Sequence, residues 1–245
     1  MKIALCLHGL VGGIKGKNYQ LLGGESEVLD KSFKHNYNNI LSKFDTDVFI
    51  HSWSVSSKDK ILNLYNPKDF IIEPQINFEI PEYINPSGDS FDRAFAHLSR
   101  WYSFKKVVEL KTLYETKNNF NYDFILVQRF DLCWNIIPDF NSFDINKIVV
   151  GNTTLNLDRE WSDRWFISNS INMNKFSTLF DMIPVYMMPG GSLPSSAQYQ
   201  GISSHSLVRH HTLHLGLEPD FRYIFGGYGQ KPNDYNEVRR QYYGD

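Results

Sequence analysis

Short apolar runs alternate along the chain with segments in which apolar residues recur at helical spacing. Apolar runs at residues 3–7, 47–53 and 69–73 predict three β-strands. Apolar positions three and four residues apart over residues 28–44 and 57–65 predict the helices between those strands. This order of elements predicts a parallel sheet with right-handed crossovers.

The most informative stretch is YDFILVQRFDLCW at residues 122–134. The continuous apolar run at residues 124–127 is typical of a strand buried on both faces. Arg129 and Asp131 follow it directly, at the carboxyl end of the predicted strand. In open α/β sheets this is the edge at which ligands bind. Two interpretations remain open here: a structural ion pair in a turn, or a ligand site.

The segments around this strand continue the alternation. Residues 91–118 predict a long helix, in one piece or two. Arg100 and Lys105 fall near its middle, where they either form a solvated basic face or contact phosphate. Asn172 or Asn174 is expected to cap a helix in the carboxyl-terminal part. The remaining predicted elements are strands at 147–150 and 164–168 and helices at 173–182, 203–215 and 234–243.

Polar segments mark the predicted loops. A glycine-rich loop at residues 9–24 lacks both the GK[ST] of a P-loop and a GxGxxG pattern, so it is only a weak sign of a nucleotide cradle. Residues 75–90 and 187–199 are candidate lids over a site. Without a repeat or a low-complexity linker, the 245 residues are expected to form one domain, with a nucleotide-binding part at 1–135 and an acceptor part at 136–245.

Composition narrows the function classes. A formal charge of −2 argues against a general binder of nucleic acid. The apolar run at the amino terminus is too short for a signal peptide, and no later run reaches the roughly 20 residues of a membrane helix. Cys6 and Cys133 lie in predicted strands and form no CxxC motif, so they are interpreted as small apolar residues in a reducing, cytoplasmic setting.

Several segments, in this order, resemble the GT-A type of glycosyltransferase. They are similar to small bacterial and viral sugar transferases of polysaccharide and lipopolysaccharide synthesis. The segments are KIALCLHG, DVFIHSW, SRWYSFKKVVELKTLYE, YDFILVQRFDLCW, SDRWFISNSINMNKFSTLF and SSHSLVRHHTLHLGL. The resemblance implies an α/β fold with a Rossmann-type mixed, mostly parallel sheet flanked by helices. It also implies a nucleotide-sugar donor, a glycan acceptor and a divalent metal, Mn²⁺ or Mg²⁺, held by an Asp-x-Asp motif after the central strand.

At the position of that motif, this chain has Arg129, Phe130 and Asp131. Two versions of the site therefore remain open. In one, Asp131 holds the metal, which acts as a Lewis acid on the departing diphosphate. In the other, Arg129 binds the diphosphate through paired charge-assisted hydrogen bonds, and Asp131 orients Arg129 or holds a hydroxyl group. The resemblance favours the metal.

The other donor contacts are expected at the ends of the first two strands. His8, Gly9 and His51 would lie near the base of the nucleotide, and Arg100 or Lys105 would reach the phosphates.

The acceptor is expected to lie against the carboxyl-terminal third of the chain. Trp161, Trp165 and Tyr199 offer faces on which a sugar can stack. A transferase that inverts the anomeric centre also needs a general base near the acceptor hydroxyl. Asp163 is the first candidate and His205 the second, each with a purely structural role as the alternative.

His210 and His214 share one helix face, as zinc ligands can, but no third ligand is evident. They could equally line the acceptor site or cap the carboxyl end of the helix.

Other classes of protein make different demands on the sequence. A non-catalytic nucleotide- or sugar-binding module that has lost its metal site is the main alternative, and turnover of the donor separates it from an enzyme. A sulfotransferase needs a Ser/Thr-rich loop after the first strand, and residues 10–23 contain Gly and Lys but no Thr and no Ser. A nucleotidyltransferase needs two acidic metal ligands, and only Asp131 is in place.

Overall fold

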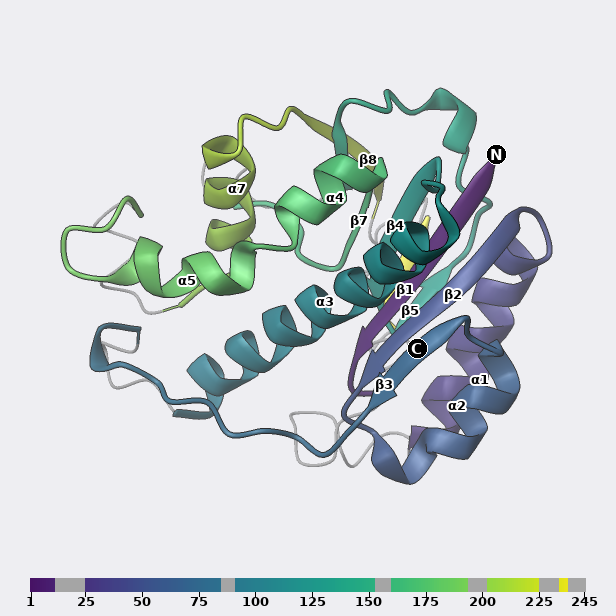
Figure 1. Ribbon diagram of the computed structural model, residues 1–245, viewed down its shortest axis with the longest axis horizontal. Coiled ribbons are helices and arrows are strands. Elements are labelled where there is room, and N and C mark those ends of the chain that lie inside the picture. The colour runs from purple at the N-terminus through teal and green to yellow at the C-terminus, as the bar shows by residue number, and fades with distance from the viewer. Residues whose placement is uncertain (12–24, 85–90, 153–159, 194–201, 225–233, 238–245) are drawn as a thin grey trace.

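The computed structural model describes residues 1–11, 25–84, 91–152, 160–193, 202–224 and 234–237. Its centre is a seven-stranded sheet with the strand order β3-β2-β1-β4-β7-β6-β8 (Figure 1). The strands are β1 (Lys2–Gly9), β2 (Asp45–Ser52), β3 (Asp69–Ile72), β4 (Phe124–Arg129), β6 (Ile148–Asn152), β7 (Trp165–Ser168) and β8 (Pro219–Ile224).

Strand direction divides the sheet into two parts. β1 lies parallel to β2 and to β4, and β2 lies parallel to β3. β7 runs antiparallel to both β4 and β6, and β8 is again parallel to β6. The predicted fold class, a Rossmann-type mixed and mostly parallel sheet flanked by helices, is confirmed. The same sheet contains strands from both of the predicted parts of the chain.

One face of the sheet is covered by α3 (Phe91–Asn118), α4 (Ser170–Phe176), α5 (Leu179–Met187) and α7 (Ser204–His214). Ala4 and Cys6 of β1 face this layer, where they join a core that includes Trp101 and Phe104 of α3. The boundaries predicted for the long helix are confirmed, and it is one continuous helix of 28 residues. Its buried apolar side chains recur at helical spacing from Ala94 to Leu110 and pack into this core.

The opposite face is covered by α1 (Glu25–Asn36), its π-helical continuation Tyr37–Leu41, and α2 (Lys58–Tyr65). A small antiparallel ribbon of β5 (Leu132–Trp134) and β9 (Tyr235–Glu237) completes this layer. Ile3, Leu5 and Leu7 of β1 point into it, because successive side chains of a strand point to opposite faces. Burial on both faces explains why β1 and β4 are apolar at nearly every position.

The helix predicted at 173–182 is wrong, because the structure has two helices there. The cap is Asn169, whose side chain accepts a hydrogen bond of 2.8 Å from the amide of Asn172. Between α4 and α5, the hydroxyls of Ser177 and Thr178 bond to backbone carbonyls three residues earlier. Such local hydrogen bonds compete with those of a continuing helix, and apolar periodicity does not detect them.

The predicted helix at 234–243 is also wrong where the structure describes it, because Tyr235–Glu237 forms β9. Residues 238–243 lie outside the described part of the chain. β5, β8 and β9 were not predicted from the sequence. β5 and β9 are three residues each, too short to show a period of two, and they exist because they pair with each other across about a hundred residues of chain.

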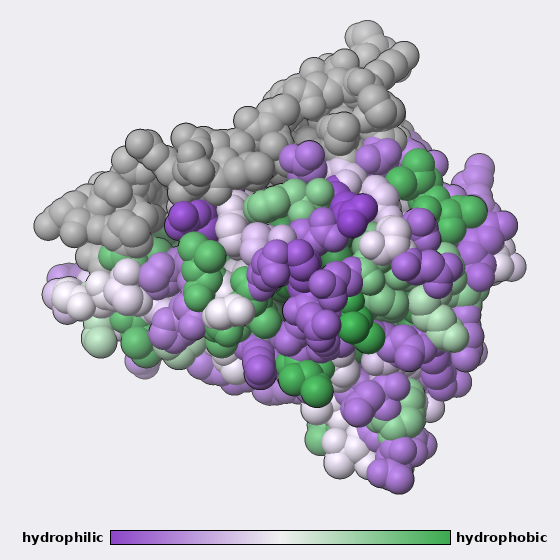
Figure 2. Space-filling model, turned by 90° about the horizontal axis from the view of Figure 1, so that it is seen from above, coloured by the Kyte–Doolittle hydropathy of each residue, from purple (hydrophilic) through white to green (hydrophobic). Residues whose placement is uncertain are grey.

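The exterior mixes polar and apolar side chains. On the face shown in Figure 2, hydrophobic residues occur in small groups separated by hydrophilic ones. Within the described segments, no helix combines the length and the apolar character that a membrane span requires. Cys6 and Cys133 are both buried thiols without a disulfide.

Candidate active site at the carboxyl edge of the sheet

The carboxyl ends of β1, β2 and β4 meet at one edge of the sheet. His8 stands in register with His51 of β2 on one side and with Arg129 of β4 on the other. Gly9 ends β1 with a positive φ of 91°, a conformation that glycine adopts without strain. Four residues predicted from three distant segments therefore lie together, as the parallel arrangement of these strands requires.

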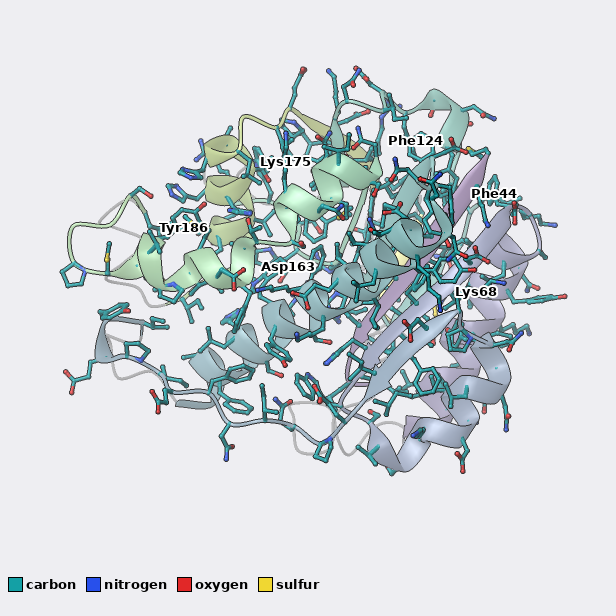
Figure 3. The ribbon with its side chains drawn as sticks, viewed as in Figure 1. Phe44, Lys68, Phe124, Asp163, Lys175 and Tyr186 are labelled. Atoms are coloured by element: carbon teal, nitrogen blue, oxygen red, sulfur yellow. The ribbon has the colours of Figure 1, made fainter. Side chains whose placement is uncertain are left out.

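Helix α3 brings Arg100 to this edge. The Nη1 group of Arg100 forms an ion pair with Oδ2 of Asp163. Asp163 is labelled in Figure 3 and precedes β7. The Nε and Nη2 groups of Arg100 are buried, and neither has a hydrogen-bond partner among the residues that the structure describes. Buried guanidinium donors without partners are costly. Arg100 is therefore suited to receive an anionic ligand.

Arg129 and Asp131 form a paired contact between a guanidinium and a carboxylate. Nε of Arg129 donates to Oδ1 of Asp131 at 2.8 Å, and Nη2 donates to Oδ2. Both oxygens of Asp131 therefore accept hydrogen bonds from the same guanidinium. This contact orients Arg129 at the end of β4.

The site carries more positive than negative charge. Arg100 interacts electrostatically with Asp163 and Asp131, and also with Arg129 and Arg164. Three guanidinium groups thus face two carboxylates. Burial alone would raise the pKa of the Asp163 carboxyl, but the charge of Arg100 and of the other basic groups outweighs burial and holds this pKa well below its usual range.

His8 lies inside this charged group and is almost fully buried, with 1% of its surface exposed. Burial, together with the charges of Arg100 and Arg129, holds the pKa of His8 well below its ordinary value, so the imidazole is neutral. Its Nδ1 atom is buried, and no described residue offers it a hydrogen bond. His8 can therefore contribute a neutral hydrogen-bonding group next to the two guanidiniums.

His205 lies on the other side of Asp163, in the first turn of α7. Its Nδ1 atom is 2.8 Å from the carbonyl oxygen of Trp161 and 3.7 Å from Oδ1 of Asp163. Because a carbonyl oxygen only accepts hydrogen bonds, Nδ1 carries the proton and the neutral ring keeps its lone pair on Nε2. The structure thus brings together Asp163 and His205, the two residues predicted as candidate bases.

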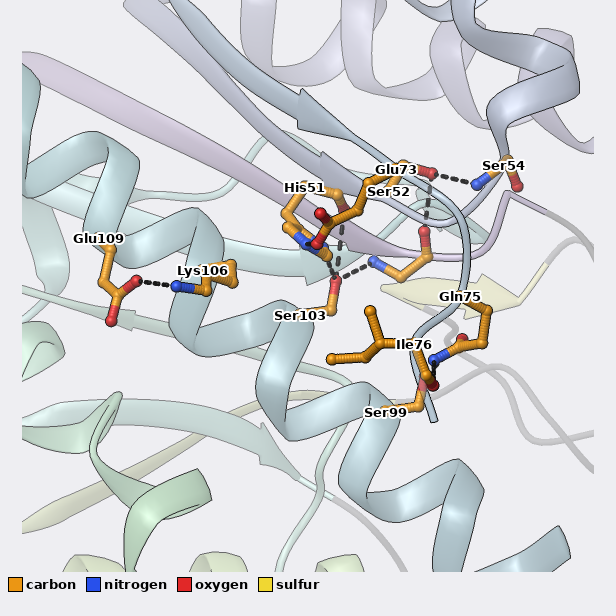
Figure 4. A network of polar contacts seen from close by, with 11 residues as sticks. His51, Ser52, Ser54, Glu73, Gln75, Ile76, Ser99, Ser103, Lys106 and Glu109 are labelled. Atoms are coloured by element: carbon orange, nitrogen blue, oxygen red, sulfur yellow. Dashed lines mark hydrogen bonds and ion pairs between the residues drawn. The ribbon is translucent and has the colours of Figure 1, made fainter. Parts of the chain in front are cut away.

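Ser103, His51 and Glu73 form an array that resembles a Ser-His-acid triad (Figure 4). Oγ of Ser103 lies 2.7 Å from Nδ1 of His51, and Nε2 of His51 lies 3.2 Å from Oε1 of Glu73. However, Ser103 is 0% exposed, and its Oγ also accepts a 2.8 Å hydrogen bond from the amide of Gly9. This array therefore connects the ends of β1 and β2 to α3 and presents no accessible nucleophile.

The structure places Lys105 outside this group of residues. Its Nζ lies 2.7 Å from both carboxylate oxygens of Asp181 on α5. Five positions separate Lys105 from Arg100, which turns the two side chains about 140° apart around the helix. Of the two phosphate contacts predicted on this helix, only Arg100 reaches the carboxyl edge.

Two of the predicted acceptor contacts are buried in the core. Trp165 is 0% exposed and contacts the ring of Trp134, and Trp161 packs edge-on against Phe221. The prediction that these two indoles offer faces to a sugar is therefore wrong, because the sheet needs them for packing. Tyr199 lies outside the described residues, as does most of the second candidate lid.

The other histidines of α7, namely His210, His211 and His214, lie apart from the carboxyl edge. His210 bonds to Ser192 at 2.9 Å, and its ring stacks on that of His214 at 6.5 Å between centroids. His211 is fully buried and bonds to the hydroxyl of Tyr186 at 2.7 Å. These contacts join α7 to α5 and the segment that follows it, so the half-buried His210 and the exposed His214 border a packing interface.

We expect burial of His211 to make the protein sensitive to acid. Burial lowers the pKa of His211 from 6.5 to about 4. Between pH 6.5 and pH 4, His211 is protonated in the unfolded chain but not in the native state. The free energy of unfolding therefore falls as the pH falls. The loss from this group should reach about 3 kcal/mol at pH 4. Urea denaturation at pH 7 and pH 4 should show this loss in the wild type, and the loss should be smaller in His211→Gln.

The same exchange at the exposed His214 is the matched control. His214→Gln should keep the wild-type difference between pH 7 and pH 4. If His211→Gln and the wild type lose the same stability on acidification, burial of His211 does not control this part of the pH dependence.

Two residues at the edge were not identified from the sequence, namely Ser103 and Arg164. Ser103 lies three positions after Arg100, so helical spacing alone places both on one face of α3. Arg164 follows Asp163 directly and is buried beside it. Spacing along α3 was therefore a usable signal for Ser103, whereas nothing in the local pattern marked Arg164.

A comparison with protein-family models found no match for this chain. A comparison with curated proteins also found no match.

Proposed function

We propose that this protein is a glycosyltransferase that moves a sugar from a nucleotide-sugar donor to a hydroxyl group of a glycan or another acceptor. The observation that carries the proposal is the buried guanidinium of Arg100, with two donors that no described residue engages, beside Arg129 at the carboxyl edge of the sheet. This edge is where open α/β sheets bind ligands, and guanidinium groups match the geometry of phosphate oxygens.

The donor would lie across the ends of β1, β2 and β4. Gly9 allows the ligand to approach the backbone, and the neutral His8 adds a hydrogen-bonding group. Arg100 and Arg129 would hold the diphosphate and stabilise the negative charge that develops as it leaves. His51 supports this edge through its bonds to Ser103 and Glu73.

For the general base, the geometry favours His205 over Asp163. The Asp163 carboxylate is stabilised by Arg100 and has a strongly lowered pKa, which makes it a weak acceptor of protons. The Nε2 atom of His205 has the lone pair, and Asp163 lies where it can stabilise the imidazolium that forms after proton transfer. Asp163 is then a positioning residue, and His205 takes the proton of the acceptor hydroxyl.

Both cysteines are buried thiols, which suits a reducing compartment such as the cytoplasm. We therefore propose that the reaction takes place there.

We expect one nucleotide sugar from a panel of UDP-, GDP-, CMP- and dTDP-linked donors to raise the melting temperature and to be turned over. A ligand at about 100 times its Kd adds roughly 2.7 kcal/mol to the free energy of unfolding, which gives a clear thermal shift. Release of the nucleotide, measured with and without glycan acceptors, tests transfer itself. The proposal requires that release increases when the right acceptor is added.

A second candidate function, a non-catalytic nucleotide- or sugar-binding module, makes a different prediction. It is favoured by the replacement of the first motif aspartate by Arg129. A nucleotide that stabilises the protein but is never released from its sugar, with any acceptor, would support the binding module and contradict the transferase.

A further inference from the structure

Two carboxylates at this edge, Asp131 and Asp163, are paired with arginines. Asp131 accepts hydrogen bonds from Arg129 on both of its oxygens. Asp163 is paired with Arg100 through Oδ2 and lies 3.7 Å from His205 through Oδ1. A divalent cation would have to share either carboxylate with a guanidinium that is already bound to it.

The surroundings also disfavour a divalent cation. Mg²⁺ and similar hard cations prefer several oxygen ligands. In the described part of the chain, no three acidic, histidine or cysteine side chains are arranged to hold a metal ion. The charges nearest to Arg100 include two further guanidiniums, Arg129 and Arg164, which would repel a cation. The residues present therefore do not fit the metal that the resemblance implies.

The same residues fit a diphosphate. Nε and Nη2 lie on one edge of the Arg100 guanidinium, the edge that forms two parallel hydrogen bonds with an anion. Asp163 holds the opposite part of this guanidinium through Nη1. Arg129 is oriented by Asp131, and the Nδ1 atom of His8 is also buried without a described partner.

We infer that the donor diphosphate is held and neutralised by Arg100 and Arg129, with His8 as a neutral hydrogen-bonding group, and that no divalent metal takes part in binding it. The inference rests on the proposed function, because it concerns the same donor site. Asp131 then orients Arg129 and is not a metal ligand.

The first experiment is calorimetric titration of the full chain with UDP, GDP, CDP, ADP and dTDP, in EDTA and in Mn²⁺. One nucleoside diphosphate should bind in both buffers, with Kd values that differ by less than about tenfold. Binding that requires Mn²⁺ would overturn the metal-free site and leave the proposed function standing. Binding of no nucleotide in either buffer would contradict the proposed function and the inference with it.

Variants then separate the two versions of the site, with binding measured in EDTA. Arg100→Lys keeps the charge beside Asp163 but loses the paired donors, and should weaken binding by about tenfold or more. Arg129→Gln should have a similar effect. Arg222→Gln is the matched control, since Arg222 is half-exposed and paired with Asp220 on β8, and its Kd should equal that of the wild type.

Asp131→Asn distinguishes a metal ligand from a residue that orients Arg129. The amide oxygen still accepts a hydrogen bond from Arg129, so binding in EDTA and in Mn²⁺ should stay within about tenfold of the wild type. Loss of binding in Mn²⁺ alone would overturn the inference, and so would wild-type affinity of both arginine variants. Melting temperatures of all variants show whether each remains folded.

Discussion

Replacing His205 by glutamine should reduce kcat for sugar transfer by about 10²–10⁴, the usual contribution of a general base. The Nδ1 proton of His205 is directed to the carbonyl of Trp161, so Nε2 is the basic atom of the neutral ring. Glutamine can still donate a hydrogen bond to that carbonyl but cannot accept a proton. The Kd for the nucleotide should be unchanged, because the base acts on the acceptor and not on the diphosphate.

Asp163→Asn and His214→Gln complete this test. Asp163→Asn removes the charge that stabilises the imidazolium, so it should lower kcat less than His205→Gln. His214→Gln changes an exposed histidine of the same helix and should leave kcat unchanged. If His205→Gln retains wild-type kcat and Asp163→Asn abolishes transfer, the base is Asp163 and our assignment of the two roles is wrong.

Replacing Lys111 by methionine should lower the free energy of unfolding by about 3–5 kcal/mol. Lys111 is 0% exposed, and its Nζ donates to Glu115 at 2.8 Å, to Ser170 at 2.6 Å and to Asn174 at 2.8 Å. Glu115 is also buried, and its other oxygen accepts the amide of Tyr122 at 2.9 Å. Methionine fills the space of the lysine stem but leaves the carboxylate of Glu115 charged and unpaired, and urea denaturation at pH 7 measures the cost.

Lys106→Met is the matched control on the same helix. Lys106 pairs with Glu109 at 3.0 Å in a partly exposed position, where ion pairs contribute at most about 1 kcal/mol. The double variant Lys111→Met/Glu115→Gln should recover much of the loss, because it removes the unpaired charge. Equal costs for Lys111→Met and Lys106→Met would show that the buried network does not stabilise the fold.

Long elements with a continuous pattern were predictable from the sequence. The 28 residues of α3 keep an apolar face over many turns, and β1, β2 and β4 are apolar on both faces, so their types and approximate ends follow from the pattern alone. The break between α4 and α5 was not predictable in this way, because two hydroxyl-to-carbonyl bonds decide it.

The candidate site shows the same division. His8, His51 and Arg129 were predicted to meet because the ends of adjacent parallel strands must lie at one edge, and the register confirms it. The choice between Arg100 and Lys105 required the direction in which α3 faces the sheet. The exclusion of Trp161 and Trp165 from an acceptor surface required their packing partners.

The sequence by itself determined the fold class of this protein and the edge of the sheet where its charged residues gather, because apolar periodicity and the order of elements are local properties of the chain. Only the tertiary structure decided which charges pair there. It joined Asp163 to Arg100, placed His205 beside Asp163, and paired Asp131 with Arg129. These pairings depend on distances between segments far apart in the chain, which no local pattern encodes, and they determine whether the site attracts a metal or a phosphate.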